Sequence, residues 1–378
     1  MKQEEMLTGF CKKLGFDLVG IIEPNLLNER LEVLMDRHKK GYNSDFENKD
    51  ISLRISPHLL LPGVKSILIL GLGYYQETDF KDSLKAQVAR YARGKDYHVV
   101  MKEKMTQVVE FLKTYQGEFQ YKIFVDSSPL IERFLAEKTG LGWVGQNTCF
   151  YTKATGSWIF IGEILLTIDF ENYKPNLNSG GCYDCHICIK ACPTGALEGR
   201  YILNPHKCLA YVSQTRGIIP KEFRVWMKDN LVGCDICQEV CPNNKGVLPG
   251  GNEDFKSMDF CNIDIKDILD LSNTDFKKRY ARAAFGWCGK KVLQRNAIVL
   301  LGNRRQPDTI FLIKPFLSHH DYIMRLHAAW ALGQIGGTGS KLLLEKRVER
   351  ETNIEVLNEI KDALDKLGQK TIHNKLLT

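Results

Sequence analysis

The sequence predicts an α+β protein with several domains, because three regions of the chain differ in periodicity and cysteine content. The chain has 378 residues, and domains usually contain about 100–200 residues, so two or three are expected. Hydrophobic residues make up 44% and charged residues 26%, as in chains that bury cores. Eight of the twelve cysteines lie between Cys182 and Cys241, and helical periodicity dominates the last third.

The first region, residues 1–175, is expected to form a mixed α/β domain. Helical patterns cover 26–39 and 99–115, and strand-like runs cover 66–70, 121–125 and 158–168. The strand at 121–125 ends in Asp126, and Ser128 with Pro129 predicts that a helix begins there, with Ser128 as N-cap. An acid at the rim of a sheet is a candidate functional group. A simple cap or salt bridge is the alternative for Asp126.

The glycine-rich segment 140–147 formally matches GxGxxG. In a dinucleotide site this motif follows a strand and opens a helix, whereas here a helical segment precedes it and a strand-like segment follows. A nicotinamide site is therefore excluded. The glycines instead indicate backbone close to a large flat ligand, with Trp143 to stack and Gln146 and Asn147 to hydrogen-bond. The apolar segment 156–164, which contains Ser157 and Gly162, is expected beside the same pocket.

The second region, residues 176–250, carries the cysteine block after a polar, glycine-bearing linker. Cys182, Cys185, Cys188 and Cys192-Pro193 have ferredoxin spacing, in which three thiolates hold one [4Fe–4S] cluster and the fourth reaches another. A permuted second copy follows, so the chain supplies the eight thiolates that two clusters need. The crossover assigns Cys182, Cys185, Cys188 and Cys241 to one cluster, and Cys192, Cys208, Cys234 and Cys237 to the other.

Zinc held by four cysteines is the alternative for this block, but zinc sites do not require the spacing of the first loop. Two neighbouring clusters would pass single electrons from an external donor to a redox centre in the same protein. The remaining cysteines are expected to be small buried hydrophobic residues; they are Cys11, Cys149, Cys261 and Cys288.

The third region, residues 251–378, is expected to be helical. Segments 292–301 and 323–335 share a basic residue, an alanine and an apolar stripe at a separation of roughly 30 residues, the period of HEAT-like helix pairs. Two unrelated amphipathic helices are the alternative. From 271 to 350 the chain has 15 Lys or Arg and 5 Asp or Glu, a local excess of +10, which indicates a polyanionic partner. The candidate phosphate contacts are Lys290, Lys291, Arg295, Arg304, Arg305 and Arg325.

No apolar run approaches the roughly 18 residues that span a bilayer, and the N-terminus lacks a secretory signal. The sequence therefore predicts a cytoplasmic protein without a membrane segment, and we expect a monomer.

Taken together, these motifs resemble the epoxyqueuosine reductase family over essentially the whole chain. The resemblance rests on Arg54 upstream of Leu-Pro-Gly-Val, the Asp-Ser-Ser-Pro-x-x-Glu-Arg motif at 126–133, the Gly-x-Gly-Trp-x-Gly-x-Asn-Thr motif, Gly-Ser-Trp, the ferredoxin loops and the basic tail. It implies a nitroreductase-like cobalamin-binding α/β domain, a ferredoxin-like domain with two [4Fe–4S] clusters and a C-terminal HEAT-like tRNA platform.

The resemblance also implies an activity, the last step of queuosine synthesis. The clusters would reduce cobalamin to Co(I), which attacks the epoxide of epoxyqueuosine at the wobble position of tRNA anticodons, and Asp126 would donate a proton. Such a donor must be protonated, which burial favours. The family's cofactor contacts carry over to Arg54, Trp143, Gln146, Asn147, Ser157 and Gly162. This chain departs from the family pattern at Gln146, where many relatives have Lys, and at Asn243–Asn244.

Two other functions share part of this pattern. A reductive dehalogenase would use cobalamin and two clusters, but it predicts an export signal and no basic helical tail. An electron-transfer subunit or a cluster-bearing tRNA-binding protein would keep the cysteines and lack a cofactor pocket. Binding of a corrinoid distinguishes this last class from the reductase.

Overall fold

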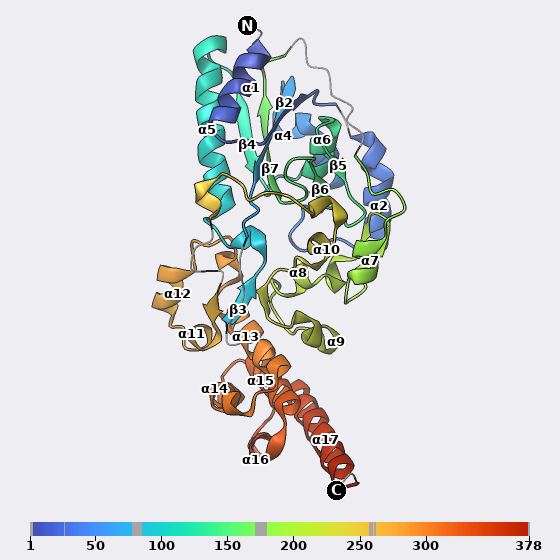
Figure 1. Ribbon diagram of the computed structural model, residues 1–378, viewed down its shortest axis with the longest axis vertical. Helices are drawn as coiled ribbons and strands as arrows, with labels where there is room; N and C mark the ends of the chain where they lie inside the picture. Colours follow the sequence, from blue (N-terminus) through green and yellow to red (C-terminus); the bar gives the residue numbers. More distant parts are fainter. Residues whose placement is uncertain are drawn as a thin grey trace. The chain divides into compact units, whose positions relative to one another are not determined.

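The computed structural model describes residues 3–25, 27–77, 85–170, 180–256, 260 and 262–376, with side chains to residue 368. The chain divides into two compact units. The first comprises Met1–Thr78, Arg90–Cys208 and Asp235–Met258, and the second comprises Asp79–Ala89, Leu209–Cys234 and Asp259–Thr378. Figure 1 shows the chain coloured along the sequence. In the part that the structure describes, no helix has the length and apolar character needed to cross a membrane.

The first unit contains a four-stranded sheet in the order β1-β2-β7-β4, in which all neighbours are antiparallel. Its strands, together with those of two small hairpins, are β1 (Leu18–Ile22), β2 (Ser66–Gly73), β4 (Tyr121–Val125), β5 (Trp143–Val144), β6 (Phe150–Tyr151), β7 (Ile159–Leu166), β8 (Leu197–Gly199) and β9 (Ile202–Leu203). Its helices are α1 (Gln3–Lys13), α2 (Leu31–Lys39), α3 (Ile51–Ile55), α4 (Pro57–Leu60), α5 (Tyr97–Gln116), α6 (Glu132–Lys138), α7 (Ile187–Ala191) and α10 (Ile236–Glu239).

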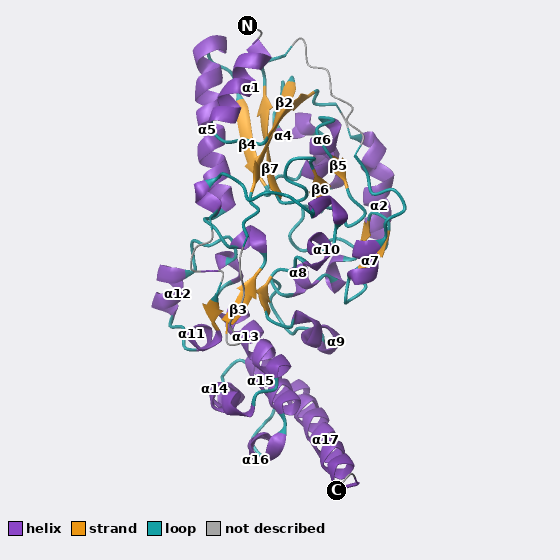
Figure 2. Ribbon diagram, in the orientation of Figure 1, coloured by secondary structure: helices purple, strands orange, loops and turns teal. Residues whose placement is uncertain are grey.

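Helices cover both faces of this sheet (Figure 2). All residues of β2 are buried, because alternate side chains point to opposite faces and both faces are covered. Ile67 and Ile69 lie in one apolar cluster with Phe134 and Leu135 of α6. On the opposite face, Met101 of α5 packs against β7.

The elements predicted for the first unit agree with the structure at α2, α5, β2, β4 and β7. The predicted start of α6 is wrong by several residues. Ser128 Oγ accepts the Leu130 N–H at 2.9 Å in a local turn, and the helix begins at Glu132 after Ile131. A short hydroxyl side chain stabilises either a cap or a tight turn, and here it stabilises the turn that follows Asp126.

The second unit contains a three-stranded sheet in the order β10-β3-β11, with β10 parallel and β11 antiparallel to β3. These strands are β3 (Lys85–Val88), β10 (Asn230–Val232) and β11 (Ile263–Asp264). Its helices are α8 (Leu209–Val212), α9 (Lys221–Arg224), α11 (Ile265–Leu269), α12 (Asn273–Arg279), α13 (Lys290–Arg304), α14 (Ile310–Ile313), α15 (Tyr322–Ile335), α16 (Gly337–Val348) and α17 (Ile354–Leu376).

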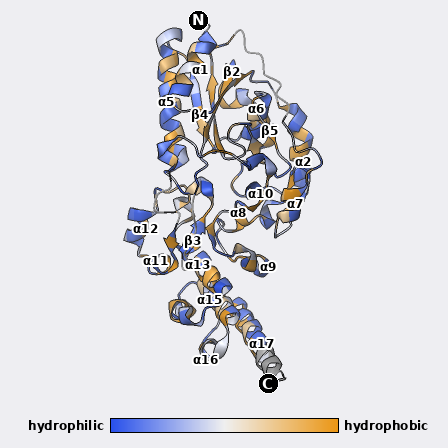
Figure 3. Cartoon of the chain, in the orientation of Figure 1, coloured by the Kyte–Doolittle hydropathy of each residue, from blue (hydrophilic) through white to orange (hydrophobic). Residues whose placement is uncertain are grey.

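Helices α13, α15 and α17 pack in succession within this unit, and apolar residues are frequent along α13 and α15 (Figure 3). Small residues set the close approach between them. A Cβ on Gly302 of α13 would lie 2.7 Å from Trp330 of α15, and one on Gly333 of α15 would lie 2.6 Å from Ala363 of α17. The two glycines occupy equivalent places in the predicted repeat, so each helix contacts the next in a similar way.

Candidate functional site

Asp126 lies directly after β4, at the edge of the sheet in the first unit. Its backbone has a left-handed φ of 53°, a conformation that costs a non-glycine residue energy and that recurs at functional sites. Tyr97 Oη donates to Asp126 Oδ2 at 2.5 Å, and His98 Nε2 lies 3.9 Å from the same oxygen. The Asp126 side chain is 62% exposed, so the protein alone does not bury this acid.

Two residues at the start of α5, Tyr97 and His98, lie against the Asp126 carboxylate, and no local sequence pattern predicts either of them. Burial and the Asp126 carboxylate raise the pKa of Tyr97 well above its ordinary value, so the phenol remains a hydrogen-bond donor. Burial opposes protonation of His98, but Asp96 accepts from its Nδ1 at 2.7 Å and the net effect raises the His98 pKa. The start of α5 therefore supplies Asp126 with one hydrogen-bond donor, the Tyr97 hydroxyl, and one titratable imidazole nearby, that of His98.

A second pair of acids, also missed, lies on the α6 side of the sheet. Glu163 is the one charged residue in the apolar strand β7 and is fully buried. Glu132 opens α6, and its Oε1 atom is buried. A lone acid in an apolar strand is a signal that the sequence carries, because burying an unpaired carboxyl costs free energy.

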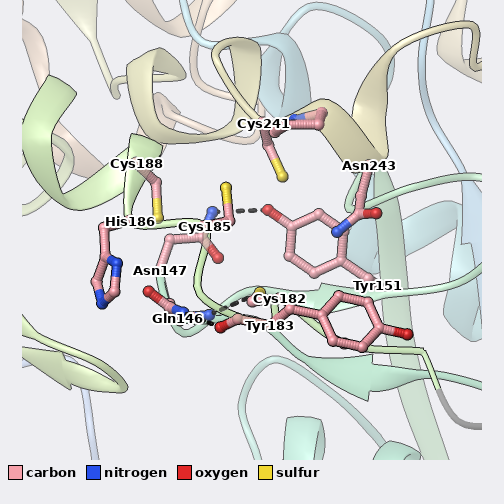
Figure 4. A pocket seen from close by; sticks show the side chains of 12 residues that line it. Gln146, Asn147, Tyr151, Cys182, Tyr183, Cys185, His186, Cys188, Cys241 and Asn243 are labelled. Carbon is pink, nitrogen blue, oxygen red and sulfur yellow. Dashed lines mark hydrogen bonds between the residues drawn. The ribbon is translucent and has the colours of Figure 1, made fainter.

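The first predicted group of thiols surrounds a single cavity of about 160 Å³ (Figure 4). Cys182, Cys185, Cys188 and Cys241 all line it. The Gln146 N–H donates to Cys182 Sγ at 3.3 Å, the kind of bond that stabilises a thiolate ligand. The four thiols that the crossover pattern assigned to one cluster are thus brought together.

Burial and the neighbouring thiols disfavour a free thiolate at Cys188 in this cavity. Burial raises the pKa of the Cys188 thiol to about 11, and Cys182 and Cys241 beside it add to the shift. Thiolate is the form that binds metal, so iron would supply the charge that ionises these thiols. Among the described residues, no three His, Cys, Asp or Glu side chains form a group that could hold a single metal ion. The thiols instead surround a wider space.

The second predicted group is divided between the two units. Cys192, Cys208 and Cys237 belong to the first unit, and Cys234 belongs to the second. All four are half-buried. Asn147 Nδ2 donates to the Cys237 carbonyl at 3.3 Å, which ties the glycine-rich segment to this part of the cysteine block.

The other cysteines differ in surroundings. Cys11 and Cys288 are buried, as predicted, whereas Cys149 is half-buried. A hydrogen bond with Cys237 lowers the pKa of Cys149, so this thiol lies beside a predicted cluster ligand. Cys261 lies outside the described residues.

Three of the predicted cofactor contacts belong to the glycine-rich hairpin. Gln146 and Asn147 are buried and line the cysteine cavity. Asn147 Nδ2 also donates to Tyr151 Oη at 2.8 Å. The Trp143 ring stacks on Tyr151 with centroids 5.7 Å apart. These side chains therefore support the first cysteine group.

The other three predicted contacts are engaged by the protein elsewhere. Arg54 forms a salt bridge with Glu47. Ser157 Oγ donates to Gln238 Oε1 at 2.9 Å. Gly162 is a packing residue, because a Cβ there would lie 2.9 Å from Met101. The structure thus places Gln146 and Asn147 at the cysteine cavity and Arg54, Ser157 and Gly162 in other contacts, and the six-residue cofactor set stays a prediction.

Three of the six predicted phosphate contacts are arginines whose largely buried guanidinium groups bind acceptors within the second unit. Arg295 is 2% exposed and donates to the carbonyls of Thr215 and Gly217 at 2.8 and 2.7 Å. Arg304 bonds Asp229 at 2.9 Å, and the Arg325 guanidinium holds Glu351 with two bonds of 2.8 Å. Because these guanidinium groups bind protein acceptors, we remove them from the candidate set.

The remaining candidates are more accessible. The side chain of Lys291 is 60% exposed, although it lies 3.0 Å from Asp321. Arg305 is exposed at the end of α13, and Lys290 is half-buried at its start. These three residues keep the capacity to meet phosphate.

Three family models match separate parts of the chain. Residues 54–127 match "Epoxyqueuosine reductase QueG, DUF1730", residues 181–244 match a 4Fe-4S double cluster binding domain, and residues 288–365 match HEAT repeats. The second match covers all eight predicted cluster ligands and confirms the two-cluster prediction. The third match confirms the predicted helical repeat and not the alternative of two unrelated amphipathic helices.

Relatives match over nearly the full chain. The epoxyqueuosine reductase of Bacillus cereus is 34% identical over 380 residues, covering 98% of both chains, and that of Staphylococcus aureus is 33% identical over 371 residues, covering 97% of this chain and 96% of the other. A solved epoxyqueuosine reductase with an epoxyqueuosine-modified tRNA stem loop has a TM-score of 0.91 and 32% identity, covering 97% of this chain and 98% of that chain. The chain belongs to the epoxyqueuosine reductase family.

Proposed function

We propose that this protein reduces epoxyqueuosine to queuosine at the wobble position of tRNA anticodons, the last step of queuosine synthesis. The observation that carries the proposal is the presence, in one chain of this family, of a four-thiol cavity and a hydrogen-bonded acid at a sheet edge. The first supports electron transfer, and the second supports proton transfer. Reduction of an epoxide to an alkene and water consumes two electrons and two protons, so the reaction needs both.

The domain boundaries of the proposal are 1–175 for a nitroreductase-like catalytic domain, 176–250 for a ferredoxin-like domain and 251–378 for a HEAT-like domain. We assign the electron path to two [4Fe–4S] clusters with the ligand sets given by the crossover pattern. An external low-potential donor would reduce them. Since tRNA is the proposed substrate, we place the protein in the cytoplasm, and we propose that it acts as a monomer.

We propose cobalamin as the second redox cofactor. When bound, its cobalt centre supplies a nucleophile for carbon, which iron–sulfur clusters do not provide. The residues proposed to contact it are the six predicted from the sequence, of which Gln146 and Asn147 line the four-thiol cavity. Absence of corrinoid binding would favour the electron-transfer or tRNA-binding alternative.

Asp126 is the proposed proton donor to the oxygen released from the epoxide. Its exposed side chain is accessible to a substrate, and the Tyr97 hydroxyl fixes the position of one carboxyl oxygen. His98, close to the same oxygen, can return a proton from solvent. A positioned general acid of this kind contributes typically 10²–10⁴-fold to a rate.

Two observations support tRNA as the partner. A relative of the same fold was solved with an epoxyqueuosine-modified tRNA stem loop, and this chain has a local charge excess of +10 over 271–350. Phosphate contacts position such a substrate, while a base leaves the anticodon loop to reach the reacting groups. We propose Lys290, Lys291 and Arg305 as phosphate contacts.

The test is anaerobic incubation of the iron- and cobalamin-reconstituted full chain with epoxyqueuosine-tRNA and a low-potential reductant, followed by mass analysis of the nucleosides. Conversion to queuosine is expected. Fully loaded protein contains about eight irons and about one cobalt per chain, from two [4Fe–4S] clusters and one cobalamin. If such protein leaves epoxyqueuosine unchanged, the proposal is contradicted. If tRNA still binds in that case, the protein is a cluster-bearing tRNA-binding protein.

A further inference from the structure

Trp287 is a large aromatic side chain that the fold leaves at the surface of the second unit. It is 52% exposed and lies in a 3₁₀ helix, Gly286–Cys288, directly before α13. Phe285 and Cys288 are both buried. Because side chains three residues apart eclipse in a 3₁₀ helix, these two face the interior and Trp287 faces solvent. Exposure of so large an apolar ring forgoes hydrophobic stabilisation, and no step of the proposed reduction uses it.

The backbone holds Trp287 beside the end of α12. A Cβ on Gly286 would lie 2.3 Å from the Tyr280 carbonyl oxygen and 2.7 Å from that of Ala281, so only glycine fits this approach. Tyr280 directly follows α12. The Gly286 N–H donates to the Ala283 carbonyl at 2.8 Å. Trp287 therefore belongs to a closely packed, hydrogen-bonded turn that joins α12 to α13.

This turn lies in a strongly basic part of the chain. Between Asp275 and Asp308 there are nine Lys or Arg residues and no Asp or Glu. Six of the nine lie in 277–291, which covers the last turn of α12, the connecting turn and the start of α13. Together with Trp287 they form what we call the Trp287 surface; they are Lys277, Lys278, Arg279, Arg282, Lys290 and Lys291.

Most of the positive charge of the Trp287 surface is open to a ligand. Within the part of the chain that the structure describes, only two of the six basic residues form an ion pair. Arg279 lies 3.0 Å from Asp267, and Lys291 lies 3.0 Å from Asp321, but their side chains remain 48% and 60% exposed. Of the other four, three are exposed and Lys290 is half-buried. Exposed charge of one sign attracts a polyanion.

A second exposed tryptophan has different surroundings. Trp226 is 41% exposed and also lies in a three-residue 3₁₀ helix of the second unit, Val225–Met227. The exposed acid Glu222 precedes it, and Asp229 follows it. The charges around Trp226 are therefore of both signs, whereas the segment around Trp287 carries positive charge alone.

We propose that Trp287 stacks on an unpaired base of the tRNA while the basic residues of the Trp287 surface bind the adjacent phosphates. The inference rests on the proposed function, which makes tRNA the partner, and it adds the contact that selects an unpaired nucleotide. An aromatic ring among cations binds single-stranded nucleic acid, because the ring meets the face of a base and the cations meet the backbone. In a paired stem the bases stack on one another, so the ring has no base face to meet.

The test measures binding of dye-labelled RNA to the reconstituted full chain by fluorescence anisotropy. One RNA is a tRNA anticodon stem loop, and the other is a fully paired RNA duplex of the same length. Trp287→Leu keeps an apolar side chain and removes the aromatic face, so binding of the stem loop should weaken about tenfold. Binding of the duplex should be unchanged, and so should the salt dependence of stem-loop binding, because no charge is removed.

Three further variants separate stacking from charge and from a general loss of structure. Trp287→Phe restores a flat ring and should bind the stem loop within about threefold of wild type. Trp226→Leu is the matched control and should leave binding of both RNAs unchanged. Lys278→Ala should weaken binding of both RNAs a few-fold and reduce the salt slope by about 1. Iron content and thermal unfolding confirm that each variant is folded.

Two results would overturn the inference. The first is stem-loop binding by Trp287→Leu as tight as that of wild type, which would leave the Trp287 surface to a ligand of another class, such as an acidic protein. The second is equal weakening for the stem loop and the duplex, which would show that Trp287 supports the structure and meets no base. Neither result depends on turnover. If Trp287 is needed for stem-loop binding but the wild-type chain forms no queuosine, the proposed reduction fails and the inference stands.

Discussion

The helical second unit and the four-stranded sheet of the first unit both bury charged side chains, but these side chains differ in their hydrogen-bond partners. In the second unit, Arg224 meets Glu359 at 2.9 Å and Arg325 holds Glu351 with two bonds. In the first unit, Glu163 is buried with both carboxyl oxygens unbonded in the described structure. A buried charge with its partner fixes one arrangement, whereas an unbonded carboxyl stays neutral and keeps a proton. The difference separates side chains that hold the fold from side chains that can take part in chemistry.

The largest expected effect is at Asp126, the proposed proton donor at the edge of the sheet in the first unit. Asp126→Asn keeps the hydrogen bond from Tyr97 and removes the acidic proton, so queuosine formation should fall by about 100-fold or more. Iron and cobalamin content should remain at wild-type values, measured by metal analysis and absorption spectra. Full activity in this variant would remove Asp126 from the donor role.

Breaking a satisfied pair in the helical region should affect stability instead. Arg224→Met leaves the buried Glu359 carboxylate to the half-exposed Lys221 at 3.8 Å, and losing one partner of a buried ion pair typically costs about 3–5 kcal/mol. Denaturant unfolding measures the loss. Arg279→Met is the control, because its ion pair with Asp267 is about half exposed and should contribute less than about 1 kcal/mol. Equal losses in the two variants would contradict the distinction between buried and exposed pairs.

The unbonded Glu163 carboxyl should make the free energy of unfolding depend on pH in the direction opposite to that of a carboxylate in an ion pair. Since the folded-state pKa of Glu163 is raised to about 8, the unfolded chain ionises first. Its contribution to stability is fully present below the ordinary Glu pKa, and is lost as pH rises toward 8 at up to about 1.4 kcal/mol per pH unit. Thermal unfolding from pH 5 to 9 should show a steeper decline for wild type than for Glu163→Gln. Parallel curves would show that Glu163 ionises normally.

The smallest effects are expected at the accessible basic residues. Lys290→Ala and Lys291→Ala should each weaken binding of a tRNA anticodon stem loop a few-fold and reduce the salt slope by about 1. Binding is measured by fluorescence anisotropy at several salt concentrations, with the exposed Lys12→Ala as control. An unchanged slope in both variants would place the tRNA elsewhere.

Local patterns were sufficient to predict the central elements and the first cluster site. The apolar runs at β2 and β7 and the helical period of α5 are signals within one segment, and the cysteine spacing is dictated by the cluster that it binds. The first residue of helix α6 was predicted incorrectly, because Ser128 can stabilise a turn as well as a helix cap.

Side chains whose role depends on a distant neighbour were mispredicted. Arg295 suggested a phosphate contact, but α13 is buried almost throughout its middle, and a basic residue there bonds carbonyls from another segment. The partners Tyr97 and His98 of Asp126 come from a helix about 30 residues away, a proximity that no local pattern encodes.

The amide at residue 146 has a consequence for electron flow. Gln146 donates its N–H to Cys182 Sγ, and its side chain donates to the Tyr183 carbonyl at 3.1 Å. A reduced cluster carries one more negative charge than an oxidised one, and a cation beside it would stabilise that state. The neutral Gln146 amide does not stabilise the reduced state in this way. The cluster held by the first cysteine group should therefore have a lower midpoint potential in this protein than in a Gln146→Lys variant. This protein would therefore hold its electrons at higher energy, which makes their onward transfer more favourable.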